Sequence, residues 1–161
     1  MTEIEELLYQ MIERGASDLF VSAEIPPHLK VQGRTQPAKR CGQDWPALAP
    51  GESKHFAYAL MSEVQREEFE RTKESNFALA TRTGGRYRIN VYYQRGEVSM
   101  VIRLIKTTVP SFDELGLPPQ AGQLALLKRG LVLMVGAAGS GKSTTMAAMV
   151  AHRAKSLDGH I

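Results

Sequence analysis

The sequence predicts an α/β protein in two parts: a small α/β domain with an antiparallel meander, then the beginning of a second α/β domain. Three observations predict this fold class. Apolar residues recur at helical spacing near the start of the chain, and from about residue 75 they alternate with polar residues. Further on, an uninterrupted apolar run leads into a glycine-rich segment. We expect the first domain over residues 1–105, a linker over residues 106–118 and the second domain over residues 119–161.

The first helix is marked at both of its ends. Thr2 and Glu5 have the spacing of a capping box, and Gly15 stands where a C-terminal cap belongs. The apolar residues between these ends fall on one helix face, at Ile4, Leu7, Leu8, Met11 and Ile12. The pattern therefore predicts an amphipathic helix at the start of the chain.

Two strands and a polar loop are expected next. Short strand candidates cover residues 18–21 and 28–32, on either side of a Pro-Pro pair. Residues 33–52 are rich in proline, glycine and glutamine, which is typical of a loop. Within this loop we expect neither Cys41 nor Trp45 to have a special role.

Two short helices should follow, over about residues 53–61 and 63–72. Ser62, with Gln65 three residues further on, has the pattern that begins a helix. We therefore predict that the second helix starts directly after Ser62.

The period of the apolar residues then changes to that of strands. Strand candidates over residues 76–81, 86–94 and 97–105 are separated by short glycine-containing turns, so we predict a three-stranded antiparallel meander. In the middle strand, alternation places Tyr87, Ile89, Val91 and Tyr93 on one face and Arg86, Arg88, Asn90 and Tyr92 on the other.

The second part starts after the linker, in which we expect one helical turn. Residues 120–127 are a short helix candidate. Residues 131–135 form an apolar run of strand length, typical of a strand that is covered on both faces of a parallel sheet. A helix is expected over residues 142–155.

A phosphate-binding pattern, G-x-x-x-x-G-K-(S/T), is matched in full by residues 136–143. Its glycines let backbone N–H groups turn toward phosphate oxygens, and the N-terminus of the following helix adds partial positive charge. Lys142 would reach the β and γ phosphates and is the candidate catalytic residue, while the Ser143 hydroxyl would coordinate magnesium. The expected nucleotide-binding residues are Gly136, Ala137, Ala138, Gly139, Ser140, Gly141, Lys142, Ser143 and Thr144.

The ligands predicted by this pattern are therefore ATP and Mg²⁺. The alternative is a glycine-rich turn that binds nothing. The apolar run before the pattern and the helix after it favour the binding loop, because this is the structural context that the motif requires.

The composition excludes several classes of protein. Of the 161 residues, 43% are hydrophobic and 23% are charged, which excludes a disordered or fibrous chain. No apolar run approaches the ~20 residues of a transmembrane helix. The first residues are acidic where a signal peptide would be basic, and one cysteine cannot form an internal disulfide. We expect a soluble, cytoplasmic protein with no direct membrane insertion.

The net charge of +3 is unevenly distributed. Residues 1–80 hold 9 Lys and Arg against 13 Asp and Glu, whereas residues 81–161 hold 11 against 4. The basic second half suggests an anionic ligand. Because the basic residues form no continuous run, we expect a nucleotide rather than a nucleic acid. The histidines show no metal-ligand spacing with one another or with the cysteine.

Several segments accompany the phosphate-binding loop along the chain. They are Gly-Ala-Ser-Asp-Leu-Phe at 15–20, Pro-Pro at 26–27, Val-Gln-Gly-Arg at 31–34, Arg-Tyr-Arg-Ile-Asn at 86–90, Tyr-Gln-Arg at 93–95, Ile-Arg-Leu-Ile at 102–105, Leu-Gly-Leu-Pro at 115–118 and Thr-Thr at 144–145. With these segments in this order, the chain resembles the type IV pilus retraction ATPases, the PilT/PilU family of secretion motor ATPases. Residues 93–95 and 100–103 look closer to PilU than to PilT.

The resemblance implies a PAS-like N-terminal domain, a short linker and the beginning of a RecA-like ATPase domain. It implies an ATPase that works as a hexameric ring and powers pilus retraction and twitching motility. The implied partners are the pilus platform protein of the inner membrane and a related motor ATPase, which would place the protein at the cytoplasmic side of that membrane. It also implies that Arg88 and Arg103 reach nucleotide phosphates at a subunit boundary, for which a forked guanidinium is well suited. From the pattern alone, a solvated strand face remains the alternative for these arginines.

The sequence departs from the family pattern near its end. No apolar strand that ends in acidic residues follows the phosphate-binding loop, so we expect neither a Walker B carboxylate nor a catalytic glutamate. We therefore expect a fragment of a longer protein that by itself hydrolyses ATP very slowly or not at all. With one strand and two helices in its second domain, apolar surface over residues 131–135 and 146–150 should lack cover.

Two other functions are open at this point. A regulatory or interaction module would bind other motor subunits through the PAS-like domain without catalysis. A P-loop enzyme of another kind, such as a kinase, is disfavoured because no acceptor-binding segment is recognisable. The chain begins directly at its capping box, which favours retraction ATPases over extension ATPases, whose N-terminal region is usually longer.

Overall fold

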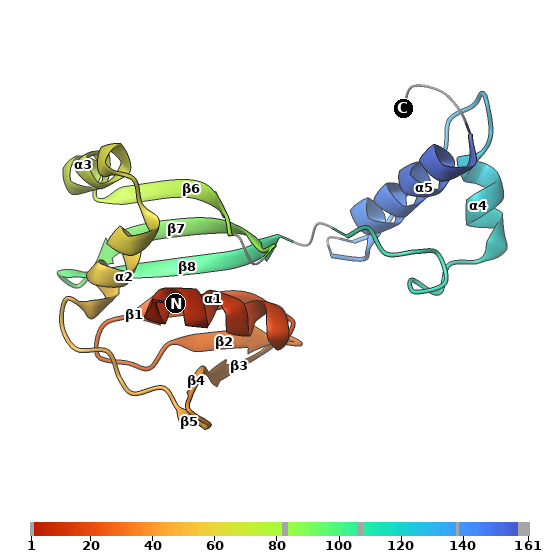
Figure 1. Ribbon diagram of the computed structural model, residues 1–161. Helices are drawn as coiled ribbons and strands as arrows, with labels where there is room; N and C mark the ends of the chain where they lie inside the picture. Colours follow the sequence, from red (N-terminus) through yellow and green to blue (C-terminus); the bar gives the residue numbers. More distant parts are fainter. Residues whose placement is uncertain (1, 82–83, 106–107, 138, 158–161) are drawn as a thin grey trace. The chain divides into compact units, whose positions relative to one another are not determined.

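The computed structural model describes residues 2–81, 84–105, 108–137 and 139–157. The chain divides into two compact units, Met1–Ile105 and Lys106–Ile161 (Figure 1). Within the described ranges, no helix is both long and apolar enough to cross a membrane.

The first unit is built on a six-stranded antiparallel sheet with the strand order β3-β2-β1-β8-β7-β6 (Figure 1). Its strands are β1 (Ala16–Ser22), β2 (His28–Val31), β3 (Arg34–Pro37), β6 (Glu74–Ala80), β7 (Arg86–Gln94) and β8 (Glu97–Ile105). The three-stranded meander that the alternation predicts, β6-β7-β8, is confirmed. In the middle of the sheet β1 pairs with β8, and this register places Asp18 opposite Arg103.

Three helices cover one face of this sheet: α1 (Glu3–Glu13), α2 (Glu52–Leu60) and α3 (Glu63–Thr72) (Figure 1). Both predicted capping boxes are present, one at Thr2 and one at Ser62. The prediction that Tyr87, Ile89 and Val91 share one face of β7 is also confirmed, and this face is buried in the core beneath the helices. The opposite face of the sheet therefore carries the arginines of β7, which are exposed.

The loop predicted over residues 33–52 is wrong in its first half. Besides β3, this segment forms a small hairpin of β4 (Lys39–Arg40) and β5 (Gln43–Asp44). Cys41 and Gly42 connect these strands with φ angles of +50° and +81°. Positive φ at both central residues is the requirement of a tight two-residue hairpin turn, so the glycine marks a turn between strands.

The hairpin is held to α1 by a buried amide. The Gln10 side chain donates from Nε2 to the backbone carbonyl of Lys39 (2.5 Å), and the Lys39 N–H donates to Gln10 Oε1 (3.0 Å). Trp45 directly after β5 is buried in the core with 2% of its surface exposed, contrary to the expectation that it has no role. The segment is ordered by these contacts with distant residues, which local composition does not reveal.

Glu70 on α3 joins the two neighbouring helices. Its carboxylate lies 2.6 Å from Lys54 Nζ on α2 and 3.0 Å from Lys73 Nζ, and it accepts a hydrogen bond from the Tyr58 hydroxyl. These hydrogen bonds, with Lys54 as the largest cause, lower the pKa of Glu70 to about 2. Because the ionised form is favoured only in the folded protein, this cluster couples stability to pH.

Acid is therefore expected to weaken the first unit through Glu70. A carboxylate whose pKa is lowered by folding stabilises the protein above its unfolded pKa of 4.5, and this contribution is lost as the pH falls toward 2. We expect the urea midpoint of unfolding to fall less over this range in Glu70→Gln than in the wild type. Fluorescence of Trp45, the single tryptophan, measures this midpoint in the first unit.

A matched control for this experiment is Glu67→Gln. It removes the same charge from the same helix at a position with no ion pair among the residues that the structure describes. This variant should follow the wild-type pH profile. The effect of Glu70 should be modest and shrink in high salt, because the carboxylate is exposed. Superimposable profiles for Glu70→Gln and the wild type would contradict the prediction.

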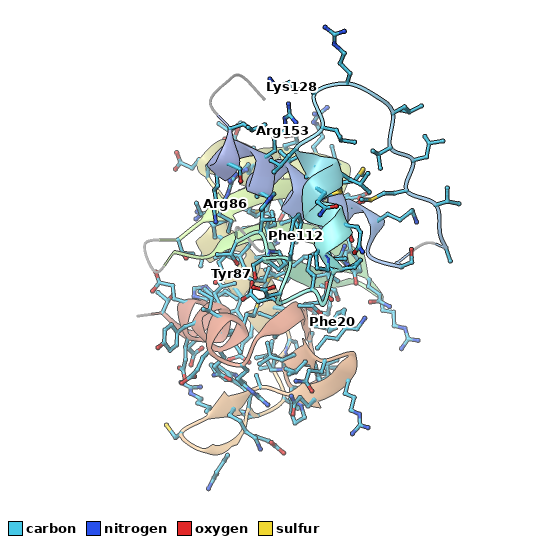
Figure 2. All side chains as sticks on the ribbon, turned by 90° about the vertical axis from the view of Figure 1, so that its right-hand side faces the viewer. Phe20, Arg86, Tyr87, Phe112, Lys128 and Arg153 are labelled. Atoms are coloured by element: carbon cyan, nitrogen blue, oxygen red, sulfur yellow. The ribbon has the colours of Figure 1, made fainter. Side chains whose placement is uncertain are left out.

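In its described residues, the second unit contains two helices and their connecting segments. α4 (Pro119–Ala125) packs against α5 (Lys142–Ser156), and Arg153 on α5 donates to the carbonyls of Ala125 and Leu127, each at 3.0 Å (Figure 2). The guanidinium thus satisfies carbonyls at the C-terminal end of α4, which no further helical turn can reach. The helical turn predicted within the linker is present at 112–116.

The strand predicted over residues 131–135 does not form. This segment has no regular secondary structure, and its apolar side chains are exposed: 82% for Leu131, 75% for Leu133 and 92% for Val135. A strand is defined by its pairing, and no other strand occurs in the described part of the second unit. The expectation that apolar surface on this segment and on α5 lacks cover is confirmed, since Met146 and Val150 are about half exposed as well.

Candidate functional site

The phosphate-binding pattern forms the turn that leads into α5. The backbone adopts a left-handed conformation at two of its glycines, with φ of +77° at Gly139 and +89° at Gly141. Side chains other than glycine rarely adopt these angles. At Gly136 a Cβ atom would lie 2.8 Å from Ser140 Oγ, closer than real contacts allow. The local backbone therefore favours glycine at 139 and 141, whereas at 136 a larger residue would require the Ser140 side chain to move.

Lys142 is the first residue of α5, and its side chain turns back over the loop. Its Nζ donates to the carbonyl of Gly136 (2.8 Å) and to that of Ala137 (2.7 Å). The ammonium group therefore lies within the curve of the loop. This location places a full positive charge beside the loop, where it could pair with an anionic ligand in place of the two carbonyls.

The N-terminus of α5 is left without a side-chain cap. Its N-cap residue is Gly141, and no side chain accepts a hydrogen bond from the first turn. The N–H groups of Lys142, Ser143 and Thr144 therefore lack an intrahelical acceptor. In α1 and α3, by contrast, a capping box supplies one. The α5 terminus thus presents N–H donors together with the positive end of the helix dipole.

This donor set fits the triphosphate of a nucleotide. It combines an ammonium group, the free N–H groups of the first turn, and the exposed residues Ser143 and Thr144. The Ser143 hydroxyl is adjacent to Lys142 and has the oxygen chemistry that Mg²⁺ prefers. Ala138, also expected in this site, lies outside the described residues. Among the residues that the structure does describe, no three His, Cys, Asp or Glu side chains are grouped so that they could hold a metal by themselves.

The two arginines assigned by resemblance belong to the first unit, on the sheet face that no helix of that unit covers. Arg88 on β7 and Arg103 on β8 are direct cross-strand partners. Like charges directly opposite each other destabilise a sheet unless something compensates them. The compensating group is Asp18 on β1, whose Oδ1 lies 2.9 Å from Arg103 Nε.

Asp18 is a buried carboxylate, with 5% of its surface exposed. Burial raises its pKa, but hydrogen bonds from Arg103 and from Ser17 Oγ (2.8 Å) outweigh burial, and the pKa is lowered. The sequence reasoning left this residue without a role. The available signal was an acidic residue directly before the apolar run of β1.

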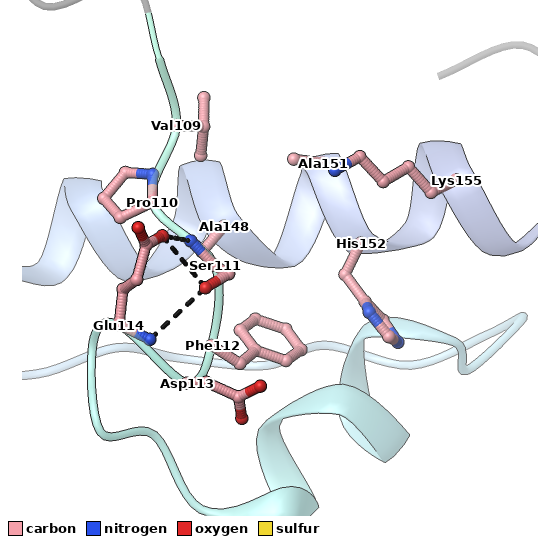
Figure 3. A pocket seen from close by; sticks show the side chains of 10 residues that line it. All are labelled: Val109, Pro110, Ser111, Phe112, Asp113, Glu114, Ala148, Ala151, His152 and Lys155. Atoms are coloured by element: carbon pink, nitrogen blue, oxygen red, sulfur yellow. Dashed lines mark hydrogen bonds between the residues drawn. The ribbon is translucent and has the colours of Figure 1, made fainter.

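A separate hollow of about 470 Å³ lies in the second unit, beside the C-terminal half of α5 (Figure 3). Phe112 packs on His152 there, with ring centroids 4.8 Å apart. Glu114 accepts hydrogen bonds from the Ser111 N–H and hydroxyl, which closes the turn (Figure 3). These contacts order the turn against the helix, and none of the lining residues belongs to the phosphate-binding pattern.

The chain was compared with family models and with known proteins. No family model matches the chain. It is 45% identical over 159 residues to the type IV pilus ATPase PilU of Pseudomonas aeruginosa, covering 99% of this chain and 40% of that protein. It is 35% identical over 148 residues to the pilus retraction ATPase PilT of the same bacterium, covering 92% of this chain and 42% of that protein.

The fold also matches that of a solved structure. A crystal structure of the pilus retraction motor PilT with bound ADP superposes with a TM-score of 0.74 and 35% identity, over 94% of this chain and 43% of that one. This match confirms the predicted fold class, and the higher identity with PilU than with PilT agrees with the segments that look closer to PilU. The chain spans about 40% of the length of these relatives.

Proposed function

We propose that this chain, a PilT/PilU-family sequence over the segment that it spans, is the ATP-binding N-terminal part of a motor ATPase that powers type IV pilus retraction. The observation that carries the proposal is the Lys142 ammonium, which lies at the uncapped N-terminus of α5 and is bonded to the carbonyls of Gly136 and Ala137 in the phosphate-binding pattern. A relative with this family name that is 45% identical over nearly the whole chain supports the same function.

The roles of the loop residues follow from their chemistry. Lys142 would exchange its two bonds to loop carbonyls for bonds to the β and γ phosphates. The N–H groups of the α5 first turn would hold the phosphate oxygens in position. Ser143 would hold Mg²⁺, which neutralises phosphate charge when it is bound. Arg88 and Arg103 would add guanidinium donors from a neighbouring subunit at the boundary between subunits.

Assembly and turnover are the further parts of the proposal. We infer a hexameric ring as the working form, which acts at the cytoplasmic side of the inner membrane with the pilus platform protein and a related motor ATPase. Hydrolysis requires a residue that orients water and a carboxylate for the metal ion. We place these groups in the part of the relatives that this chain does not span, and we expect the 161 residues alone to turn over ATP very slowly.

Nucleotide binding is tested by a titration of the purified chain with fluorescent ATP and Mg²⁺. Lys142→Ala is expected to weaken binding about 10- to 100-fold, the loss of a charge-assisted hydrogen bond to phosphate. Lys155→Ala is the matched control, because it removes the same charge from the exposed C-terminal end of the same helix. Equal binding by Lys142→Ala and the wild type, or no binding by the wild type, would overturn the proposal.

A second candidate is a non-catalytic module that binds the intact motor. The exposed apolar side chains of Leu131, Leu133 and Val135 favour it, since contiguous exposed apolar groups commonly mark an interaction surface. This function predicts co-sedimentation of the chain with an intact pilus motor in the absence of nucleotide. Co-sedimentation that depends on ATP and on Lys142 would favour the first function instead.

A further inference from the structure

We propose that Asp18 is a positioning residue, which clamps Arg103 so that the terminal nitrogens of its guanidinium face outward, next to Arg88, toward phosphate oxygens. The inference rests on the proposed function, because it takes Arg103 to be a phosphate ligand. It goes further in assigning a role to Asp18, and in explaining how two opposed arginines are held on one sheet face.

The geometry of the clamp leaves half of the guanidinium unused. Asp18 bonds Arg103 through Nε alone, at 2.9 Å. Across the described part of the chain, the terminal nitrogens of Arg103 have no hydrogen-bond partner, and 68% of its side chain is exposed. A guanidinium that is held at Nε retains its two terminal NH₂ groups, which can bind oxygens of a phosphate.

The carboxylate is itself held firmly. Asp18 lies in the centre of the sheet with 8% of its side chain exposed, and Ser17 Oγ donates to its second oxygen at 2.8 Å. Lys30 is its cross-strand neighbour on the other side. Both oxygens of the carboxylate are thus engaged, which restricts its rotation and fixes the direction in which it accepts from Arg103.

Asp18 and Arg103 belong to a row of four charged residues across the sheet, and the charges of this row explain why Arg103 needs to be held in place. Lys30, Asp18, Arg103 and Arg88 follow one another across four adjacent strands, β2, β1, β8 and β7. One carboxylate among three cations leaves the row positive. Without the clamp, the two opposed guanidinium groups would be expected to swing apart, since like charges across a strand pair repel. With it, both remain side by side at the surface.

The test depends on whether replacing Asp18 weakens or strengthens the binding of an anion. Asp18→Asn keeps the size of the side chain but removes a negative charge. If Asp18 were merely a nearby charge, its removal would make the row more positive and tighten the binding of an anion. If Asp18 positions Arg103, binding must weaken although the positive charge has increased. The two interpretations therefore predict changes in opposite directions.

Binding is measured with inorganic triphosphate by NMR of the arginine Nε–H signals, which report on the sheet arginines themselves. The full chain carries Lys142→Ala so that binding of triphosphate by the phosphate-binding loop is weakened. Triphosphate is expected to shift the Arg103 signal. Asp18→Asn is expected to weaken this binding about 3- to 10-fold, less than the loss of a whole charge-assisted bond, because Arg103 remains but is no longer held in position. In an Arg103→Ala background, followed through the Arg88 signal, Asp18→Asn should cause no further loss, because the two residues act as a unit.

Three results would overturn the proposal: no response of Arg103 to triphosphate, equal or tighter binding in Asp18→Asn, or an equal further loss in the Arg103→Ala background. If Asp18→Asn does not fold, as judged by Trp45 fluorescence, the variant Ser17→Ala is used in its place. Ser17→Ala keeps the Asp18 carboxylate but removes the hydrogen bond to one of its oxygens. Triphosphate binding is then expected to be about 2-fold weaker than in the parent chain. Unchanged binding in Ser17→Ala would then count against the clamp. Because Lys142 is absent throughout, the outcome is independent of the test of nucleotide binding by the loop.

Discussion

Replacing Tyr87 by alanine is expected to lower the free energy of unfolding of the first unit by about 3–5 kcal/mol, the usual cost of deleting a buried aromatic side chain. Tyr87, the second residue of β7, is completely buried in the core (Figure 2). Its hydroxyl donates to the backbone carbonyl of Leu8 at 2.9 Å and so ties the sheet to α1. Urea unfolding followed by the fluorescence of Trp45 reports on this unit alone, because Trp45 is the single tryptophan.

The matched control is Tyr87→Phe, which keeps the ring and removes only the hydroxyl. It should cost about 0.5–1.5 kcal/mol, the net value of one hydrogen bond. The remaining difference between the two variants measures the packing of the ring against the core. That packing is tight on one side, since a Cβ atom added at Gly85 would collide with the Tyr87 hydroxyl group. A loss below about 1 kcal/mol in Tyr87→Ala would show that the core is not formed as described.

Elements whose signals are local could be predicted from the sequence. A capping box is completed within four residues, so Thr2 with Glu5 and Ser62 with Gln65 mark the starts of α1 and α3 without any knowledge of the rest of the fold. The meander was predictable for a similar reason. Its strands are consecutive, and the short glycine turns between them decide which strands pair.

Elements that depend on distant partners were predicted wrongly. The β4–β5 hairpin is secured by Gln10, 29 residues before the backbone group that it binds, and local composition carries no sign of this contact. The apolar run at 131–135 shows the opposite error, since a strand was predicted there and none forms. Its residues have the composition of a buried strand, but a strand requires a neighbouring strand to pair with, and composition does not supply one.

The candidate site likewise has one part that could be predicted from local sequence and one part that depends on distant residues. The loop over residues 136–143 could be predicted because all of its donors lie in one short segment. The contact between Asp18 and Arg103 could not, since it joins residues 85 positions apart and depends on the pairing of β1 with β8. The sequence shows an acidic residue beside an apolar strand and an arginine on another strand. Only the register shows that the two side chains meet.

Replacing Gly141 by valine is expected to weaken ATP binding about 10- to 100-fold while leaving the first unit unchanged. Gly141 has φ of +89°, and nothing lies within 4 Å of the position that a Cβ would occupy. The expected defect is therefore one of backbone conformation and not of crowding, and a β-branched residue is an outlier at such angles. Moving Gly141 out of this conformation would redirect the N–H groups at the start of α5. Titration with fluorescent ATP and Mg²⁺ measures the change.

Gly130→Val is the matched control for this conformational strain. Gly130 lies in the same unit with φ of +123°, precedes the phosphate-binding loop, and has equally open space, with no atom within 4 Å of where a Cβ would lie. The substitution imposes strain six residues before the loop begins and leaves the loop glycines unchanged, so ATP affinity should stay within about 2-fold of the wild type. Equal losses in both variants would mean that strain anywhere in the second unit impairs binding. Wild-type affinity in Gly141→Val would show that the left-handed backbone at this glycine is not what holds the phosphates.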